Sequence, residues 1–225
     1  MKARFDKPDA AAFTDLGVYF AGQQNYTCAA NAFATSLQME PAQKDVAHVA
    51  FMFGSSLYFS GDLKEAIASL QEAEKLGYHD IKIHLILAAA LDASHATPDA
   101  EAEWRAAIEI DPEASNALDS LSNDLISDGD YKGAIDLLEK PRLSGQRTVQ
   151  QSLNLGAAYA KSGKLEEAAR VLRDGLNTTP DSLELANGLA EILNQLGRKE
   201  EATMVLEVAR SQHAAQAQQP SPSNP

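Results

Sequence analysis

Apolar and small residues recur along this chain at a fixed interval. Blocks that begin at residues 47, 81, 115, 149 and 183 follow one another without a gap and carry the same class of residue at the same position. Position 20 of these blocks is always alanine, from Ala66 in the first to Ala202 in the last. An earlier block begins at residue 10 and carries Ala29 at the same position. Random composition would not produce this register, so the sequence predicts an internal repeat with a period of about 34 residues.

Within each block, the spacing of the apolar positions predicts two helices. Positions 4, 7, 8 and 11 lie on one face of a first helix, and positions 20, 24 and 27 lie on one face of a second. Small residues at positions 8 and 20 allow the helices to approach closely, and large residues at positions 7, 11 and 24 fill the space between them. Glycine at position 15 in four blocks, as at Gly163, predicts that the first helix ends in a left-handed residue.

This pattern resembles the tetratricopeptide repeat, a helix–turn–helix unit of about 34 residues. The block that begins at residue 149 matches it at Leu155, Gly156, Tyr159, Ala168, Leu172 and Pro180. The resemblance implies an all-α fold, a right-handed superhelix (solenoid) of six units in which each unit contacts its neighbours. We expect the units at 10–43, 47–80, 81–114, 115–148, 149–182 and 183–216, with a lead-in at 1–9 and a disordered tail at 217–225.

Two features bear on the regularity of the array. Pro141 falls inside the second helix of the fourth block, where proline removes a hydrogen bond and clashes with the preceding turn. We therefore expect that helix to end near Lys140 and a loop to follow. In the last helix, Arg210 and Gln212 occupy places where packing against a further repeat would require apolar groups, which we interpret as a finished C-terminal end.

Composition narrows the classes of partner and location. The net charge is −13 and no stripe of Lys and Arg interrupts the acidic surface, which disfavours nucleic acid as a partner. No run approaches the roughly 18 apolar residues of a membrane span, and the N-terminus lacks the apolar core of a secretory signal. These features predict a cytoplasmic protein without direct membrane insertion. A periplasmic or envelope-associated location stays open if the N-terminus is processed.

The candidate chemical motifs do not meet the requirements of their chemistry. Gly156, Gly163 and Lys164 resemble a phosphate-binding loop, but six residues separate the glycines instead of four. Leu165 then stands where Ser or Thr would reach magnesium. The five histidines and the single cysteine show no metal-ligand or nucleophile spacing, and Trp104 holds a core position. We therefore expect no catalytic residue, no cofactor and no metal.

The resemblance also indicates where a partner would bind. In the tetratricopeptide repeat family, positions 2, 5, 6, 9, 12 and 13 line a concave groove. In this chain those positions are apolar and aromatic in the N-terminal half and rich in asparagine in the C-terminal half. The candidate partner-binding residues are Phe51, Tyr58, Phe59, Asn116, Asp119, Asn123, Asn154, Asn187, Glu191 and Asn194.

Asparagine side chains suit a partner's main chain because their amides both donate and accept hydrogen bonds, whatever the partner's sequence. The register turns Asn154 toward the groove, and the aromatic end would hold one or two apolar anchors. A simpler interpretation is that the asparagines are only solvated. Some co-chaperones of the family clamp acidic C-terminal peptides with Lys, Arg and Asn, but Thr14, Val18 and Met52 stand at those positions here, which disfavours that role.

We interpret the chain as a non-enzymatic scaffold or adaptor that binds a partner protein or extended peptide in the concave groove. Its acidity, deepest in the block 81–114, favours a neutral or basic partner segment. Two alternatives stay open. In the first alternative, the chain is the repeat region of a larger enzyme, such as a glycosyltransferase or a signalling protein. In the second, it is a cell-envelope assembly or secretion factor. Its oligomeric state does not follow from these patterns.

Overall fold

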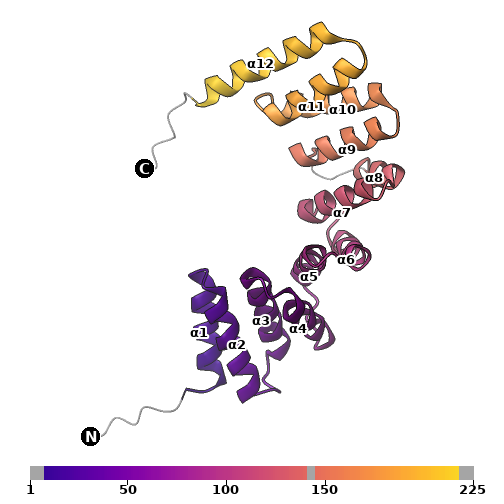
Figure 1. Cartoon of the computed structure of the whole chain (residues 1–225). Coiled ribbons are helices and arrows are strands. Elements are labelled where there is room, and N and C mark those ends of the chain that lie inside the picture. Colours follow the sequence, from indigo (N-terminus) through magenta and orange to yellow (C-terminus); the bar gives the residue numbers. More distant parts are fainter. Residues whose placement is uncertain (1–7, 141–144, 218–225) are drawn as a thin grey trace, which may run out of the picture. The chain divides into compact units, whose positions relative to one another are not determined.

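The structure, a computed structural model, describes residues 8–140 and 145–217, and within those ranges every regular element is an α-helix (Figure 1). The chain divides into two compact units, Met1–Asp111 and Pro112–Pro225. The first unit holds α1 Ala10–Gly22, α2 Tyr26–Met39, α3 Val46–Ser60, α4 Leu63–Lys75, α5 Ile81–Ala93 and α6 Thr97–Ile110. The second unit holds α7 Ser115–Ser127, α8 Tyr131–Leu138, α9 Val149–Lys161, α10 Leu165–Thr178, α11 Leu183–Gln195 and α12 Lys199–Ala217.

Consecutive helices pack in pairs, and each unit contains three such pairs. In the first unit α1 packs on α2, α3 on α4 and α5 on α6, while α2 contacts α3 and α4 contacts α5. The second unit repeats the arrangement from α7 to α12, with α8 against α9 and α10 against α11. Each pair therefore stacks on the next pair of its unit, and the prediction of an all-α fold built from six helix–turn–helix units is confirmed.

The two helices of a pair approach closely because a small residue faces a large one. A methyl group added to Gly156 of α9 would lie 2.9 Å from the side chain of Leu172 on α10. One added to Gly54 of α3 would lie 2.8 Å from Leu70 on α4. The alanine predicted at position 20 is buried in every pair, at Ala29, Ala66, Ala100, Ala134, Ala168 and Ala202. The core residues therefore lie where the repeat register placed them.

Glycine ends the first helix of four pairs, as the sequence predicted. Gly61, Gly129, Gly163 and Gly197 have φ values of +92°, +84°, +82° and +79°. This left-handed conformation is one that glycine adopts without the steric penalty of a Cβ atom. The turns between paired helices are thus set by local sequence.

The α8 helix is shorter than its counterparts. It ends at Leu138, two residues before Lys140, in agreement with the predicted break. Pro141, the predicted cause of the break, lies outside the described residues, as does the stretch 218–225. At the other end of the unit, α12 continues to Ala217, the first residue of the predicted tail.

A hydrogen bond from a tyrosine of α9 stabilises the end of α8. The Tyr159 hydroxyl donates a hydrogen bond to the carboxylate of Glu139, the residue that follows the last turn of α8. Burial of the phenol, followed by this hydrogen bond to a carboxylate, raises the pKa of Tyr159 to about 12. The hydroxyl therefore keeps its proton, and its role as a donor, throughout the neutral range.

The close approach of α9 and α10 predicts the effect of enlarging Gly156. In Gly156→Val the added methyl groups must displace Leu172, which is 3% exposed, so overpacking should lower the free energy of unfolding by about 1–3 kcal/mol. Urea unfolding followed by circular dichroism measures this change. Gly188→Ala is the matched control, since its Cβ would lie at an ordinary 3.4 Å from Leu153. The control should be neutral or stabilising, and equal destabilisation by both variants would contradict the explanation.

Candidate partner-binding groove

A groove between α9 and α11 is the candidate binding site of the second unit. The groove contains an open recess with a volume of about 470 Å³. Its lining residues are Leu153, Asn154, Gly156, Ala157, Ala160, Lys161, Leu172, Gly188, Glu191, Ile192 and Gln195. Most of these side chains are apolar or small, and the exposed polar ones are Lys161, Glu191 and Gln195.

The cavity exists because the helix faces that line it carry small side chains. On α9, Leu153, Ala157 and Ala160 follow one another at the spacing of a single helical face. On α11, Gly188 presents no side chain at all, and Ile192 lies one turn further on. Small residues on both helices leave an apolar recess that is open to solvent. Such a recess can accept an apolar side chain from a partner.

Asn154 does not present a free amide to this groove. It is 6% exposed, and its amide nitrogen donates to the main-chain carbonyl of Asp119 at 3.1 Å and to the hydroxyl of Ser122 at 2.8 Å. Its amide oxygen accepts a hydrogen bond from Gln150 at 2.8 Å. Both donors and the acceptor are thus used inside the protein. These hydrogen bonds hold α9 against α7, and the contact of Asn154 with a partner's main chain stays a prediction.

The other polar residues predicted for this unit lie at the surface, with one exception. Asp119 on α7 is half-buried. The exposed residues are Asn116, Asn123, Asn187, Glu191 and Asn194. Of the ten predicted residues, Asn154 and Glu191 line the cavity. The exposed asparagines lie on α7 and α11 and are not part of the groove wall.

The three aromatic residues predicted in the first unit have different environments. Phe51 is 8% exposed because its ring stacks on Tyr78, with the ring centres 4.3 Å apart and the planes 10° from parallel. Tyr58 is half-buried and packs on the core. Phe59 is 54% exposed and stacks on Tyr26 with the ring centres 4.9 Å apart. Phe51 thus contributes to packing, and Phe59 is the accessible ring of the three.

Of the eleven residues that line the groove, nine are absent from the ten candidates that the sequence singled out. Leu153, Gly188 and Ala160 hold groove positions 5, 6 and 12 of their repeats, so the register alone could have found them. They are apolar or small, so a choice of candidates restricted to polar and aromatic side chains leaves them out. Ile192 holds position 10, which the family register does not assign to the groove.

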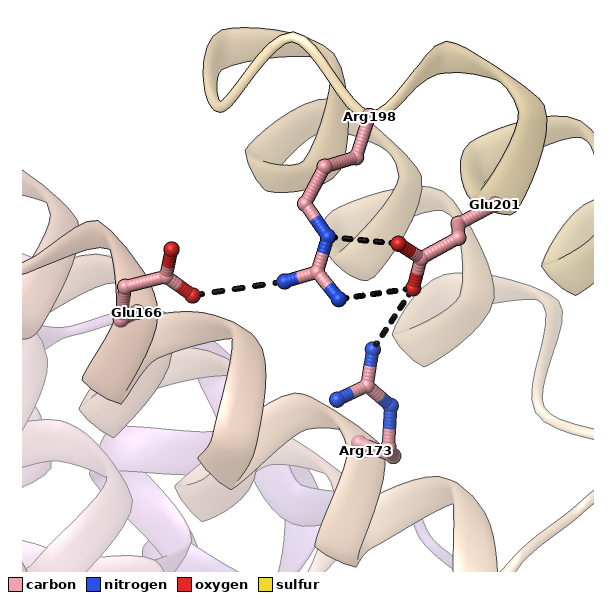
Figure 2. Close-up of polar contacts among 4 residues, drawn as sticks. All are labelled: Glu166, Arg173, Arg198 and Glu201. Atoms are coloured by element: carbon pink, nitrogen blue, oxygen red, sulfur yellow. Dashed lines mark hydrogen bonds and ion pairs between the residues drawn. The ribbon is translucent and has the colours of Figure 1, made fainter.

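A charged cluster joins α10 to the start of α12, as Figure 2 shows. Arg198 donates from Nε and Nη2 to the two carboxylate oxygens of Glu201 at 2.6 and 2.8 Å, and its Nη1 lies 3.4 Å from Glu166. Arg173 Nη2 lies 3.6 Å from the same carboxylate of Glu201. The hydrogen bond from Arg198, and then the charges of both arginines, lower the pKa of Glu201. Because the charges are mutually compensated, we assign the cluster to inter-repeat packing.

Two further polar contacts link paired helices of the first unit. The Trp104 indole nitrogen donates to Asp92 at 2.8 Å, and the Trp104 side chain is 4% exposed, as expected for a core residue. His84 Nδ1 lies 2.7 Å from a carboxylate oxygen of Glu103. Within residues 8–140 and 145–217, no group of three or more His, Cys, Asp or Glu side chains is placed to hold a metal ion. None of the helices in those ranges is both long and apolar enough to cross a membrane.

Comparisons with known proteins agree with this architecture. The sequence profile of the family described as Tetratricopeptide repeat matches residues 51–115 and 153–225. A tetratricopeptide repeat protein from Parabacteroides merdae ATCC 43184 superposes with a TM-score of 0.73 at 19% identity, covering 88% of this chain and 77% of that one. No curated protein sequence matches the chain.

Structures of MamA are also similar. MamA 41-end from Desulfovibrio magneticus RS-1 superposes with a TM-score of 0.64 at 20% identity, covering 76% of this chain and 99% of that chain. The MamA RS-1 ArsTM double mutant gives a TM-score of 0.66 at 16% identity, covering 79% and 100%. At these identities the similarity establishes a shared fold.

The hydrogen bonds of Asn154 predict a stability effect rather than a direct binding effect. Asn154→Ala leaves the Ser122 hydroxyl without this amide and should lower the free energy of unfolding by about 1–3 kcal/mol. Asn123→Ala, at an exposed position on α7, is the control and should change it by less than about 0.5 kcal/mol. Urea titrations of the two variants check the difference. A stability of Asn154→Ala equal to that of the parent would contradict the structural role.

The charged cluster predicts an acid-range dependence of stability. Because the folded-state pKa of Glu201 is lowered from its ordinary 4.5, its contribution is complete above pH 4.5 and is lost as the pH falls through the folded value. Glu201→Gln should therefore weaken the decline of the urea midpoint in this acid range. Glu200→Gln, in the same first turn of α12 but outside the cluster, is the control. An unchanged acid decline in Glu201→Gln would show that the cluster contributes nothing measurable.

Proposed function

Because the chain belongs to the tetratricopeptide repeat family, we propose that it is a non-enzymatic interaction module that binds a segment of a partner protein in the α9–α11 groove. The observation that supports this proposal is the apolar recess of about 470 Å³ between those helices. Recesses of roughly 300–1,000 Å³ are typical of specific binding sites. This one has room for one or two side chains of a peptide.

The wall of the recess favours an aliphatic side chain as the anchor. Ala157, Ala160 and Gly188 are too small to fill the space themselves, and Leu153 and Ile192 give it apolar sides. Burying a Leu or Ile side chain there would contribute roughly 1.5–3 kcal/mol through removal of apolar area from water. An ionised side chain would lose its hydration without gaining an equivalent partner on these surfaces.

Polar groups around the recess would fix the orientation of the bound segment. Lys161 and Glu191 offer charges of opposite sign, and Gln195 offers an amide. The exposed amides of Asn123 and Asn187 are available to the partner's main chain. The acidity of the whole chain, with a net charge of −13, would accelerate binding of a neutral or basic segment relative to an acidic one.

Selection from a phage-displayed library of random linear peptides tests the proposal. The protein should enrich peptides that share one aliphatic residue with few acidic neighbours. Ala157→Phe should weaken the selected peptides at least tenfold, about 1.4 kcal/mol, because the phenyl ring occupies the recess. Titration calorimetry with a synthetic peptide measures the change. Asn123→Ala and Asn187→Ala should each weaken every selected peptide by a similar factor, because they would bind main chain.

Arg170→Ala is the matched control for these variants. Arg170 is exposed on α10, where it pairs with Asp174 at 3.8 Å, and it does not line the recess. Circular dichroism and thermal midpoints establish that every variant is folded. Undiminished binding to Ala157→Phe, or equal loss in Arg170→Ala, would place the peptide elsewhere and defeat the proposal.

A further inference from the structure

The first three helices are nearly free of charge, although the chain is acidic. Residues of α1, α2 and α3 include one charged side chain, Asp15, whereas 23% of the whole chain is charged. Large apolar side chains are also exposed in this part of the chain. Leu16 is 39% exposed, Tyr19 is 62% exposed and Met39 is 49% exposed. A hairpin that carries a single charged side chain and exposes several large apolar ones is unusual for a solvated end, and it indicates a contact surface.

The outer side of the α1–α2 hairpin forms an apolar hollow of about 250 Å³. Phe13, Leu16 and Phe20 line it from one face of α1, and Asn31 and Thr35 contribute from α2. Every residue that lines the hollow belongs to these two helices. We call this surface the hairpin face.

The opposite side of the same hairpin is already used for stacking. Ala29 and Phe33 of α2 form a core cluster with Val49 of α3. Figure 1 shows the same order within this unit, with α1 and α2 followed by α3. No residue of α3 lines the hollow, so the hairpin face is a part of the first pair that the next pair leaves uncovered.

We propose that the hairpin face binds the hairpin face of a second copy of this chain, giving a two-fold symmetric dimer. Two copies that each carry a net charge of −13 repel one another. None of the residues lining this hollow is ionised, so here two copies can come together without placing like charges in contact.

The composition of the face also suits pairing with itself. A two-fold interface brings the same patch of each copy together, so the patch must be complementary to itself. Phe13, Leu16 and Phe20 provide apolar contact, and Asn31 and Thr35 both donate and accept hydrogen bonds. This proposal is independent of the α9–α11 groove, because the two surfaces lie in different units.

The size of the face sets the expected strength of the dimer. A 13-residue helix is about 20 Å long, and two helices side by side are about 20 Å wide. The resulting area of roughly 400 Å² per copy is below the ~800 Å² per partner of a standard interface. We therefore expect a reversible dimer with a dissociation constant in the micromolar range or above.

Sedimentation velocity of the full chain, from about 1 µM to about 1 mM, tests the proposal. The parent protein should shift with concentration from its 24.1 kDa monomer toward a dimer. Leu16→Glu should raise the dissociation constant at least tenfold, because it places two carboxylates in the apolar contact. Asn31→Glu, at an exposed position of the same face, should do the same if Leu16→Glu does not fold.

Val18→Glu is the matched control on the same helix. Val18 is 50% exposed, lies two residues from Leu16 and does not line the hollow, so the variant adds the same charge on another side of α1. It should dimerise like the parent. A parent that stays monomeric at all concentrations, or equal loss in Val18→Glu, would overturn the proposal. Loss of the dimer in Met204→Glu, at an exposed apolar position of α12, would also overturn it, because the contact would then involve a different face.

Discussion

Each helix pair of this protein depends on a small residue that faces a large one sixteen positions later in the chain. The constraint is tightest at Gly17, where an added methyl group would lie 2.5 Å from the ring of Phe33. In the third pair, Ala88 and Trp104 hold the same two positions, and both are buried. The closeness of the two helices fixes the shape of the pair, and the shape of the pair fixes how the next one stacks on it. The remaining surface of each helix is then free to vary, as expected where repeats contact only their neighbours.

This constraint explains why the fold could be predicted from the sequence. The same class of residue recurs at each core position of the six repeats, so a position that is ambiguous in one repeat can be assigned from the others. Even the position of a left-handed glycine such as Gly61 is predictable in this way. The break in the fourth pair was also predictable in place, since α8 ends at Leu138, close to Lys140. At these positions the local signals that end a helix and the periodicity of the repeat predict the same structure. Such agreement between local preference and overall fold is what makes a sequence specify its fold.

The surroundings of the candidate partner-binding residues could not be predicted from the sequence, because their side chains make contacts that the repeat register does not encode. Asn154 holds a groove position, yet its amide is bound to Ser122 and to the carbonyl of Asp119, both on an earlier helix. Phe51 likewise turns to Tyr78, which follows the second helix of its own pair. In both cases the side chain contacts a residue outside its own helix instead of facing solvent. The wall of the recess consists instead of residues such as Ala160 and Gly188, whose contribution is the volume they leave empty.

The positions that the core constraint leaves free are where repeats of one fold come to differ. On α10, positions 22 and 26 of the repeat are Arg170 and Asp174, which form an exposed ion pair. On α12 the same positions are Met204 and Val208, which are 58% and 56% exposed. No packing requirement of the repeat distinguishes these two pairs of residues, because neither touches the small-to-large contact that holds the helices together. A departure from the usual charged surface at such a position therefore costs the fold little. Such a departure is explained by what the surface contacts, and the same reasoning applies to the hairpin of α1 and α2, which carries one charged side chain.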